Sequence, residues 1–185
     1  MTKKTELVWS EKISEEQIEF TQPEIMLKLI STIDERGWPH ITLISSNRII
    51  NNQELVWGAF SEGNSKENVK ENPKQGILYM TTDTPFEFMQ VKANFTRIEK
   101  EGEELEYFNR TELMRYFTYV RVHTAYFNQI KSARPVRKMG LMGIISGIAK
   151  DIIGKGGLKT DIDEERLGPI GYDLYTAPIA VRAID

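Results

Sequence analysis

The sequence predicts a small, mostly antiparallel β-barrel with flanking helices, an α+β arrangement within one domain of 185 residues. Apolar runs between residues 25 and 99 are separated by polar turn sequences, as in strands joined by short connections. A single short helical stretch interrupts these runs, and after about residue 102 the pattern becomes helical. We therefore expect a barrel core at about 25–100 and a helical and C-terminal extension at about 102–185.

The first two strands form a predicted β-hairpin. Residues 25–33 are rich in aliphatic side chains and are followed by the turn sequence Asp34 to Gly37. The second strand covers residues 39–46, and alternation along it separates two faces. One face carries His40, Thr42 and Ile44, and the other carries Ile41, Leu43 and Ser45. After a turn at residues 51–53, a third strand is predicted from Glu54 to Phe60.

A short helix is predicted between the third and fourth strands, within Gly63 to Pro73. Asn64 is a good N-cap with Glu67 three residues later, as in a capping box, and Asn72-Pro73 ends the helix. Further strands are predicted at Gly76 to Thr82 and at Phe86 to Glu99.

The two ends of the chain are read as flanking elements. Residues 11–20 predict a short helix or an extended arm, anchored by Ile13, Ile18 and Phe20. Residues 103–119 have helical spacing, and residues 174–184 are compatible with a final strand. The glycine-rich segment 139–157 is expected to pack on the barrel or on a second subunit, with a membrane-surface helix as the alternative.

Composition excludes several classes of function. A net charge of −3 gives no support for a nucleic-acid partner. The chain has no cysteine, so it has neither disulfides nor thiolate metal sites, and its two histidines predict no metal site. No signal peptide and no apolar run long enough to span a bilayer are visible, so we expect a cytoplasmic protein without a membrane partner.

The start of the helix at residues 64–71 is a candidate phosphate site. Free N–H groups at a helix start favour an anion, and Ser65 and Lys66 add a hydroxyl donor and a positive charge there. A well-capped surface helix explains the same residues equally well. Elsewhere, Arg134 and Arg137 either recognise an anion or a partner, or belong to a solvated basic face. Trp57 either flanks a ligand or fills the core.

Several segments, taken in order, resemble the FMN-binding split-barrel proteins, the pyridoxamine 5′-phosphate oxidase-like family. Ser31 to His40 is similar to their opening hairpin, and Leu55 to Phe60 to their third strand. The pattern Ser65-Lys66-x-Asn68-Val69-x-x-Asn72-Pro73 is similar to their phosphate-proximal helix, and Gly76 to Thr82 to the strand after it. The resemblance covers roughly residues 25 to 98, under half of the chain.

This resemblance implies a six-stranded antiparallel split barrel that forms a homodimer, with FMN in a cleft between the subunits. The isoalloxazine ring would lie along the second and third strands, and the helix start would hold the phosphate. The implied cofactor-binding residues are His40, Ile41, Thr42, Leu43, Ile44, Ser45, Trp57, Gly58, Ala59, Phe60, Ser61, Ser65 and Lys66.

The function implied is that of an FMN-dependent oxidoreductase acting on a small-molecule substrate or electron donor, with the catalytic residues unknown. The chain lacks the Arg-x-His pair that pyridoxamine phosphate oxidase uses near its end, so the vitamin-B6 reaction is not implied. A non-catalytic flavin carrier or sensor is one alternative. A haem or deazaflavin binder on the same barrel is another.

Overall fold

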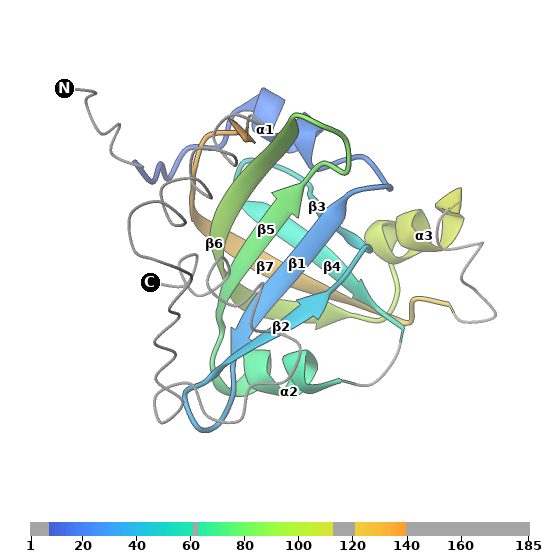
Figure 1. Cartoon of the computed structure of the whole chain (residues 1–185). Coiled ribbons are helices and arrows are strands. Elements are labelled where there is room, and N and C mark those ends of the chain that lie inside the picture. The colour runs from blue at the N-terminus through green and yellow to red at the C-terminus, as the bar shows by residue number, and fades with distance from the viewer. Residues whose placement is uncertain (1–7, 61–62, 113–120, 140–185) are drawn as a thin grey trace, which may run out of the picture.

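One antiparallel sheet, curled into a partial barrel, forms the body of the protein (Figure 1). The computed structural model describes residues 8–60, 63–112 and 121–139. The elements in this part are α1 (Glu15–Phe20), β1 (Leu27–Ile33), β2 (Pro39–Leu43), β3 (Asn47–Ile49), β4 (Glu54–Ala59), α2 (Asn64–Glu71), β5 (Lys74–Met80), β6 (Phe86–Glu99), α3 (Glu103–Arg110), β7 (Thr124–Ala133) and β8 (Arg137–Met139).

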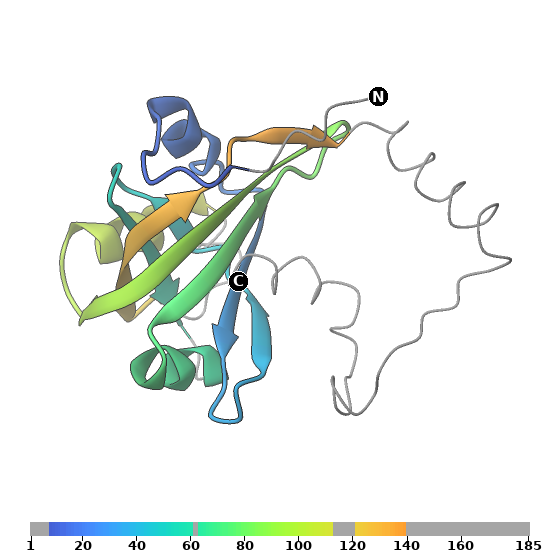
Figure 2. The same ribbon diagram turned by 90° about the vertical axis from the view of Figure 1, so that its left-hand side faces the viewer.

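The strands follow the order β2-β1-β5-β6-β7-β4-β3, and β8 pairs with β6. Every strand pair in the described residues is antiparallel, as predicted. The path holds seven strands rather than six. α1 and α2 lie at opposite ends of the barrel, as Figures 1 and 2 both show. The two edge strands, β2 and β3, follow each other in the chain, so the barrel has an open seam between them.

The strand β7, which lies between β6 and β4, was not predicted. The helix predicted from residue 103 is present as α3, which ends at Arg110, but no strand was predicted at residues 124–133, where β7 lies. Both faces of β7 are largely buried, so its sequence does not alternate between apolar and polar side chains. The predictions for residues 113–119, 140–157 and 174–184 lie outside the described residues.

The core lies inside the curled sheet and includes a buried polar network. Trp57 stacks on Tyr126 with the ring centroids 3.9 Å apart, and its indole N–H donates to Gln75 Oε1. Gln75 in turn donates to Asn128 Oδ1 on β7. Each buried polar group named here has a partner, which offsets the cost of removing it from water.

α1 closes one end of this core. Ser14 and Gln17 form a reciprocal capping box at its start, and the predicted anchors Ile13, Ile18 and Phe20 all pack against the core cluster. No helix in residues 8–60, 63–112 and 121–139 is long and apolar enough to cross a membrane.

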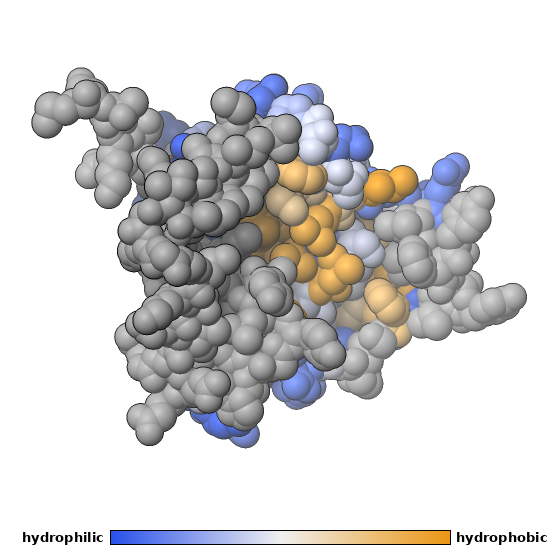
Figure 3. Space-filling model, viewed as in Figure 1, coloured by the Kyte–Doolittle hydropathy of each residue, from blue (hydrophilic) through white to orange (hydrophobic). Residues whose placement is uncertain are grey.

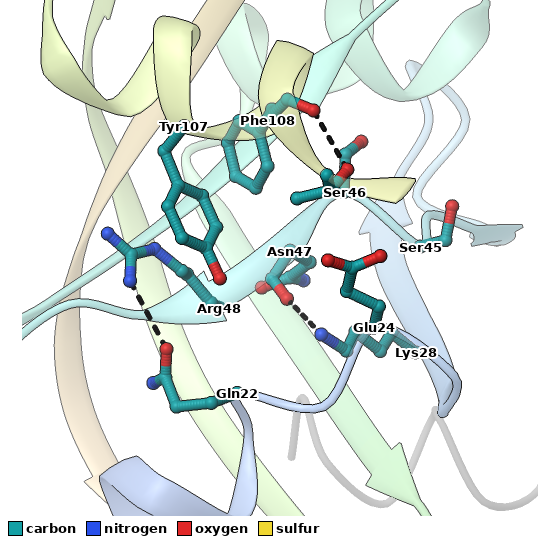
Figure 4. Close-up of a pocket in the computed structure, with 10 residues that line it drawn as sticks. Gln22, Glu24, Lys28, Ser45, Ser46, Asn47, Arg48, Tyr107 and Phe108 are labelled. Atoms are coloured by element: carbon teal, nitrogen blue, oxygen red, sulfur yellow. Dashed lines mark hydrogen bonds between the residues drawn. The ribbon is translucent and has the colours of Figure 1, made fainter. Parts of the chain in front are cut away.

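A buried lysine ties the residue after α1 to β3. Lys28 is 2% exposed, and its Nζ donates to the main-chain oxygen of Thr21 at 3.0 Å. It also donates to the main-chain oxygen of Asn47 at 2.7 Å (Figure 4). Burial lowers the pKa of Lys28 to about 8, because the ammonium loses contact with water. The negative charge of Glu24 acts to raise this pKa, and the positive charge of Arg48 acts to lower it.

An arginine on β3 holds α3 against the barrel. Arg48 donates from Nε and Nη2 to the carboxylate of Glu104, at 3.1 and 2.8 Å, and its guanidinium lies 3.8 Å from the ring centroid of Tyr107. The planar guanidinium suits both contacts at once. On the other side of α3, Phe108 is buried beside Val56 and Val122.

Gly58 sits where β4 passes beneath this helix. A Cβ added there would lie 2.7 Å from Val122 Cγ1 and 3.0 Å from Phe108 Cδ2, which is closer than packed carbon atoms approach. The glycine is therefore required by packing.

We expect Gly58→Ala to lower the free energy of unfolding by about 1–3 kcal/mol, because the added methyl group forces Val122 or Phe108 to move. Urea unfolding followed by circular dichroism measures the change. Gly63→Ala is the control for the added methyl group, since no atom outside its chain neighbours lies within 4 Å of its added Cβ and only the N-cap preference for glycine over alanine is lost. Equal stability of the two variants would contradict the packing argument.

The buried lysine gives stability a predicted pH dependence. Between the folded pKa of about 8 and the ordinary value of 10.5, the unfolded chain binds more protons at Lys28 than the folded chain. Stability therefore rises with pH in this window. We expect the wild-type protein to gain about 1–2 kcal/mol from about pH 8 to about pH 9.5 relative to Lys28→Met.

Urea unfolding at each pH measures this difference. Lys28→Met lowers stability at every pH because two buried carbonyl oxygens lose their donor, so the comparison is between slopes. Lys70→Met, at an exposed helix position, serves as the control and should keep the wild-type slope. Parallel profiles for the wild-type and Lys28→Met proteins would contradict the prediction.

Candidate functional site

A cavity of about 370 Å³ opens between β2, β4 and the start of α2. Its volume falls in the range of small-molecule and cofactor sites, about 300–1,000 Å³. The lining residues are His40, Thr42, Leu43, Ile44, Trp57, Gly58, Ala59, Phe60, Gly63, Asn64, Ser65 and Lys66. Segments far apart in the sequence thus meet at one site, next to the open seam of the barrel.

Most of the cofactor-binding residues predicted from the sequence line this cavity. Ten of the thirteen line it, and Gly63 and Asn64 are additional. Ile41 does not line it, although it lies on the same face of β2 as Leu43; it pairs with Ser31 of β1. Ser45 lines the small pocket beside Lys28 instead. Ser61 lies outside the described residues.

Most of the strand residues that line the cavity are apolar, with His40 and Thr42 of β2 as the polar ones. Trp57 is 1% exposed, so it belongs to the core and presents only a small part of its surface to the cavity. Ala59 is also buried, whereas Phe60 and Leu43 are 41% and 61% exposed. Buried and exposed apolar groups on one wall provide a surface for a flat, apolar ligand.

The start of α2 differs from the prediction at its cap. The helix begins at Asn64 with Gly63 as the N-cap, and no side chain caps the first turn. The expected capping box of Asn64 and Glu67 is therefore wrong, because Asn64 already lies inside the helix. Without a capping side chain, the first N–H groups remain directed out of the helix end, where the helix dipole favours an anion.

Ser65 and Lys66 are both buried at this helix start, with 5% and 7% of their surfaces exposed. The helix is fixed in place by Asn68, whose side-chain amide donates to Thr32 Oγ1 of β1 at 3.0 Å, and by Val69 in the core. It ends at Asn72 before Pro73, as predicted. A hydroxyl and an ammonium group are therefore held rigidly beside the apolar strand walls.

A chain of hydrogen bonds joins the helix to β2. Ser65 Oγ lies 2.7 Å from Thr42 Oγ1, and Thr42 Oγ1 lies 3.1 Å from His40 Nε2. The sequence pattern placed His40 and Thr42 on one face of the strand. It contained no signal for the contact with Ser65, which depends on how α2 packs against β2.

The other basic and histidine candidates lie elsewhere. His123 is exposed, and its Nδ1 lies 2.8 Å from Thr124 Oγ1. Arg134 lies with its Cζ 4.4 Å from the ring centroid of Trp9, and its Nη1 donates to Gln90 Oε1. Neither residue lines the cavity. These contacts support a structural role for Arg134.

No protein-family model and no curated protein matches this sequence. Solved structures do match. The chain is similar to an FMN-binding protein from Syntrophomonas wolfei subsp. wolfei, with a TM-score of 0.54 and 17% identity, over 67% of this chain and 88% of the other. HupZ from Group A Streptococcus gives a TM-score of 0.52 and 16% identity, over 65% and 91%.

HutZ, the heme storage protein from Vibrio cholerae, is similar at a lower TM-score of 0.46 and 15% identity, over 69% of this chain and 96% of the other. The first two likenesses establish that the chain has the split-barrel fold. The resemblance predicted from the sequence is therefore confirmed at the level of fold.

Proposed function

We propose that this split-barrel protein binds FMN in the cavity between β2, β4 and α2. The observation that carries the proposal is the junction of apolar strand walls with a helix start that holds the buried Ser65 and Lys66. FMN has the matching parts, a flat ring system and a dianionic phosphate. The fold shared with an FMN-binding protein supports this cofactor.

Each group of residues has a distinct task in this proposal. Lys66 supplies a charge-assisted contact to the phosphate, and Ser65 and the first N–H groups of α2 donate hydrogen bonds to it. Ile44, Ala59 and Phe60 offer the isoalloxazine ring an apolar surface. Main-chain groups of β2 and β4 form hydrogen bonds with the polar edge of the ring. Trp57, held by Tyr126, keeps this wall rigid.

We further propose that the protein is an oxidoreductase. When bound, FMN supplies the redox chemistry by accepting a hydride or electrons, and the protein binds and orients it. A carrier or sensor of flavin would use the same cavity without turnover. Reduction of the FMN-loaded protein by a nicotinamide donor supports the enzyme. Tight binding with no reduction by any tested donor supports the carrier.

The visible absorption spectrum of the freshly purified protein tests the cofactor directly. A two-banded yellow spectrum, with a released chromophore that behaves as FMN, supports the proposal. A sharp intense band in the violet would instead identify haem as the ligand. A colourless protein that also fails to bind added FMN would contradict the flavin assignment.

We expect Lys66→Ala to weaken FMN binding by about 1.5–3 kcal/mol, or about 10- to 150-fold in Kd, because one charge-assisted contact to the phosphate is lost. Quenching of flavin fluorescence on titration measures the affinity. Riboflavin, which lacks the phosphate, should bind both proteins equally. Lys70→Ala is the matched control, since Lys70 is exposed on the same helix and pairs with Glu67. Unchanged FMN affinity in Lys66→Ala would remove this residue from the site.

A homodimer with the cofactor cleft at the subunit interface is also proposed. Leu43, Leu29 and Leu78 lie in one row across β2, β1 and β5, on the face opposite to the core residues Ile30 and Ile77. Figure 3 shows apolar side chains gathered at the centre of the face on which β1 and β2 lie. Leu43 is exposed and also lines the cavity, so a second subunit on this face would lie beside the ligand.

Light scattering coupled to size-exclusion chromatography tests the dimer. We expect the mass of two chains for the wild-type protein and a shift toward one chain for Leu43→Asp, because a carboxylate would be buried in an apolar interface. Ile25→Asp is the control, since Ile25 is 75% exposed and does not line the cavity. A monomeric wild-type protein would contradict the proposal.

A further inference from the structure

The chain from His40 through Thr42 to Ser65 can arrange its protons in more than one way. Each hydroxyl group has one proton to donate. At 2.7 Å, either Ser65 donates to Thr42 or Thr42 donates to Ser65. At 3.1 Å, either Thr42 donates to His40 Nε2 or Nε2–H donates to Thr42. Without a ligand, several directions satisfy both contacts.

An anion at the start of α2 removes this freedom. The anion accepts the Ser65 proton, so Thr42 must donate its own proton to Ser65 to keep the short contact. Thr42 then has none left for the imidazole, and Nε2 of His40 must carry a hydrogen and donate it. A neutral His40 is consequently in the Nε2–H tautomer, with a lone pair on Nδ1.

We propose that Thr42 is a positioning residue that couples phosphate binding at Ser65 to the tautomer of His40. This inference rests on the proposed function, because the anion is the FMN phosphate. Its consequence is that loading the cofactor converts His40 Nδ1 into a hydrogen-bond acceptor on a residue that lines the cavity. A substrate with an N–H or O–H donor would then find this acceptor in every loaded molecule, whereas only a part of the unloaded molecules offers it.

The charged groups near His40 are few, so the effect of a bound anion reaches His40 through the hydroxyl groups of Ser65 and Thr42. Among the described residues that line the cavity, the only other titratable group is Lys66 of α2. On the β1–β2 turn, Asp34 is paired with Arg36, 3.0 Å away, and accepts hydrogen bonds from main-chain N–H groups. Thr32, the β1 partner of His40, is uncharged and accepts from Asn68.

Nitrogen-15 NMR of histidine-labelled full-length protein measures the tautomer. The chain has two histidines, so a His123→Gln background leaves His40 as the single signal. Spectra are recorded at about pH 8.5, above the ordinary range of imidazole titration. Four samples are compared: the protein alone, and the protein with saturating riboflavin, inorganic phosphate or FMN. Flavin fluorescence in the same samples reports whether FMN is bound.

We expect FMN and inorganic phosphate to reduce the Nδ1–H fraction of His40 to near zero, and riboflavin to leave it unchanged. In Thr42→Val, which has no hydroxyl, saturating FMN should not change that fraction. Thr42→Ser, which keeps the hydroxyl, should restore the wild-type response. An unchanged fraction in the wild-type protein, or an equal fall in Thr42→Val, would overturn the coupling.

The same samples separate this inference from the proposed function. If FMN binds and the tautomer does not respond, the coupling fails and the FMN assignment stands. If FMN does not bind but phosphate shifts the tautomer through Thr42, the coupling stands and the cofactor assignment fails. If neither ligand binds, both proposals are contradicted.

Discussion

The structure depends on the pairing of β7 between β6 and β4. This strand joins the two halves of the sheet, because β2, β1, β5 and β6 lie on one side of it and β4 and β3 on the other. Without it, β4 would have no neighbour from the first half, and the sheet could not curl so that β4 comes near β2. The contacts of Asn128 with Gln75 and of Tyr126 with Trp57 fix this arrangement inside the core.

The two open edges of the sheet then determine where a ligand can bind. A closed barrel would fill its interior with side chains, whereas a sheet whose edge strands diverge leaves space along the seam. In this protein, α2 packs across one end of that space. It brings Ser65 to Thr42, and its buried Asn68 and Val69 hold it there. The site is therefore a consequence of incomplete closure together with one well-anchored helix.

Close packing on one side and polar contacts on the other give the site its rigidity. Beneath β4, the backbone of Gly58 lies too close to Val122 and Phe108 for any larger residue. On the far side of the seam, Lys28 and Arg48 tie β3 to the residue after α1 and to α3. A charged group buried in this way costs desolvation energy, and its hydrogen bonds to main-chain oxygens offset that cost. The cavity thus lies between elements that have little freedom to move apart.

Local sequence patterns predicted much of this protein. The β1–β2 hairpin, the strands β4, β5 and β6, and the end of α2 at Asn72 were all visible, because turn residues and apolar runs act over a few neighbouring positions. The same patterns placed His40 and Thr42 on one face of a strand, and Ser65 and Lys66 at a helix start. A resemblance over these segments was enough to indicate the split barrel and the residues of the candidate site.

The tertiary structure decided what those patterns could not. β7 was missed because both of its faces are buried, so its sequence lacks the alternation that marks a half-exposed strand. The predicted cap, Asn64, lies one residue inside α2, because the helix begins directly after Gly63 and no side chain caps its first turn. The contact of Ser65 with Thr42 joins residues 23 positions apart. Such contacts depend on long-range pairing and packing, and no local pattern records them.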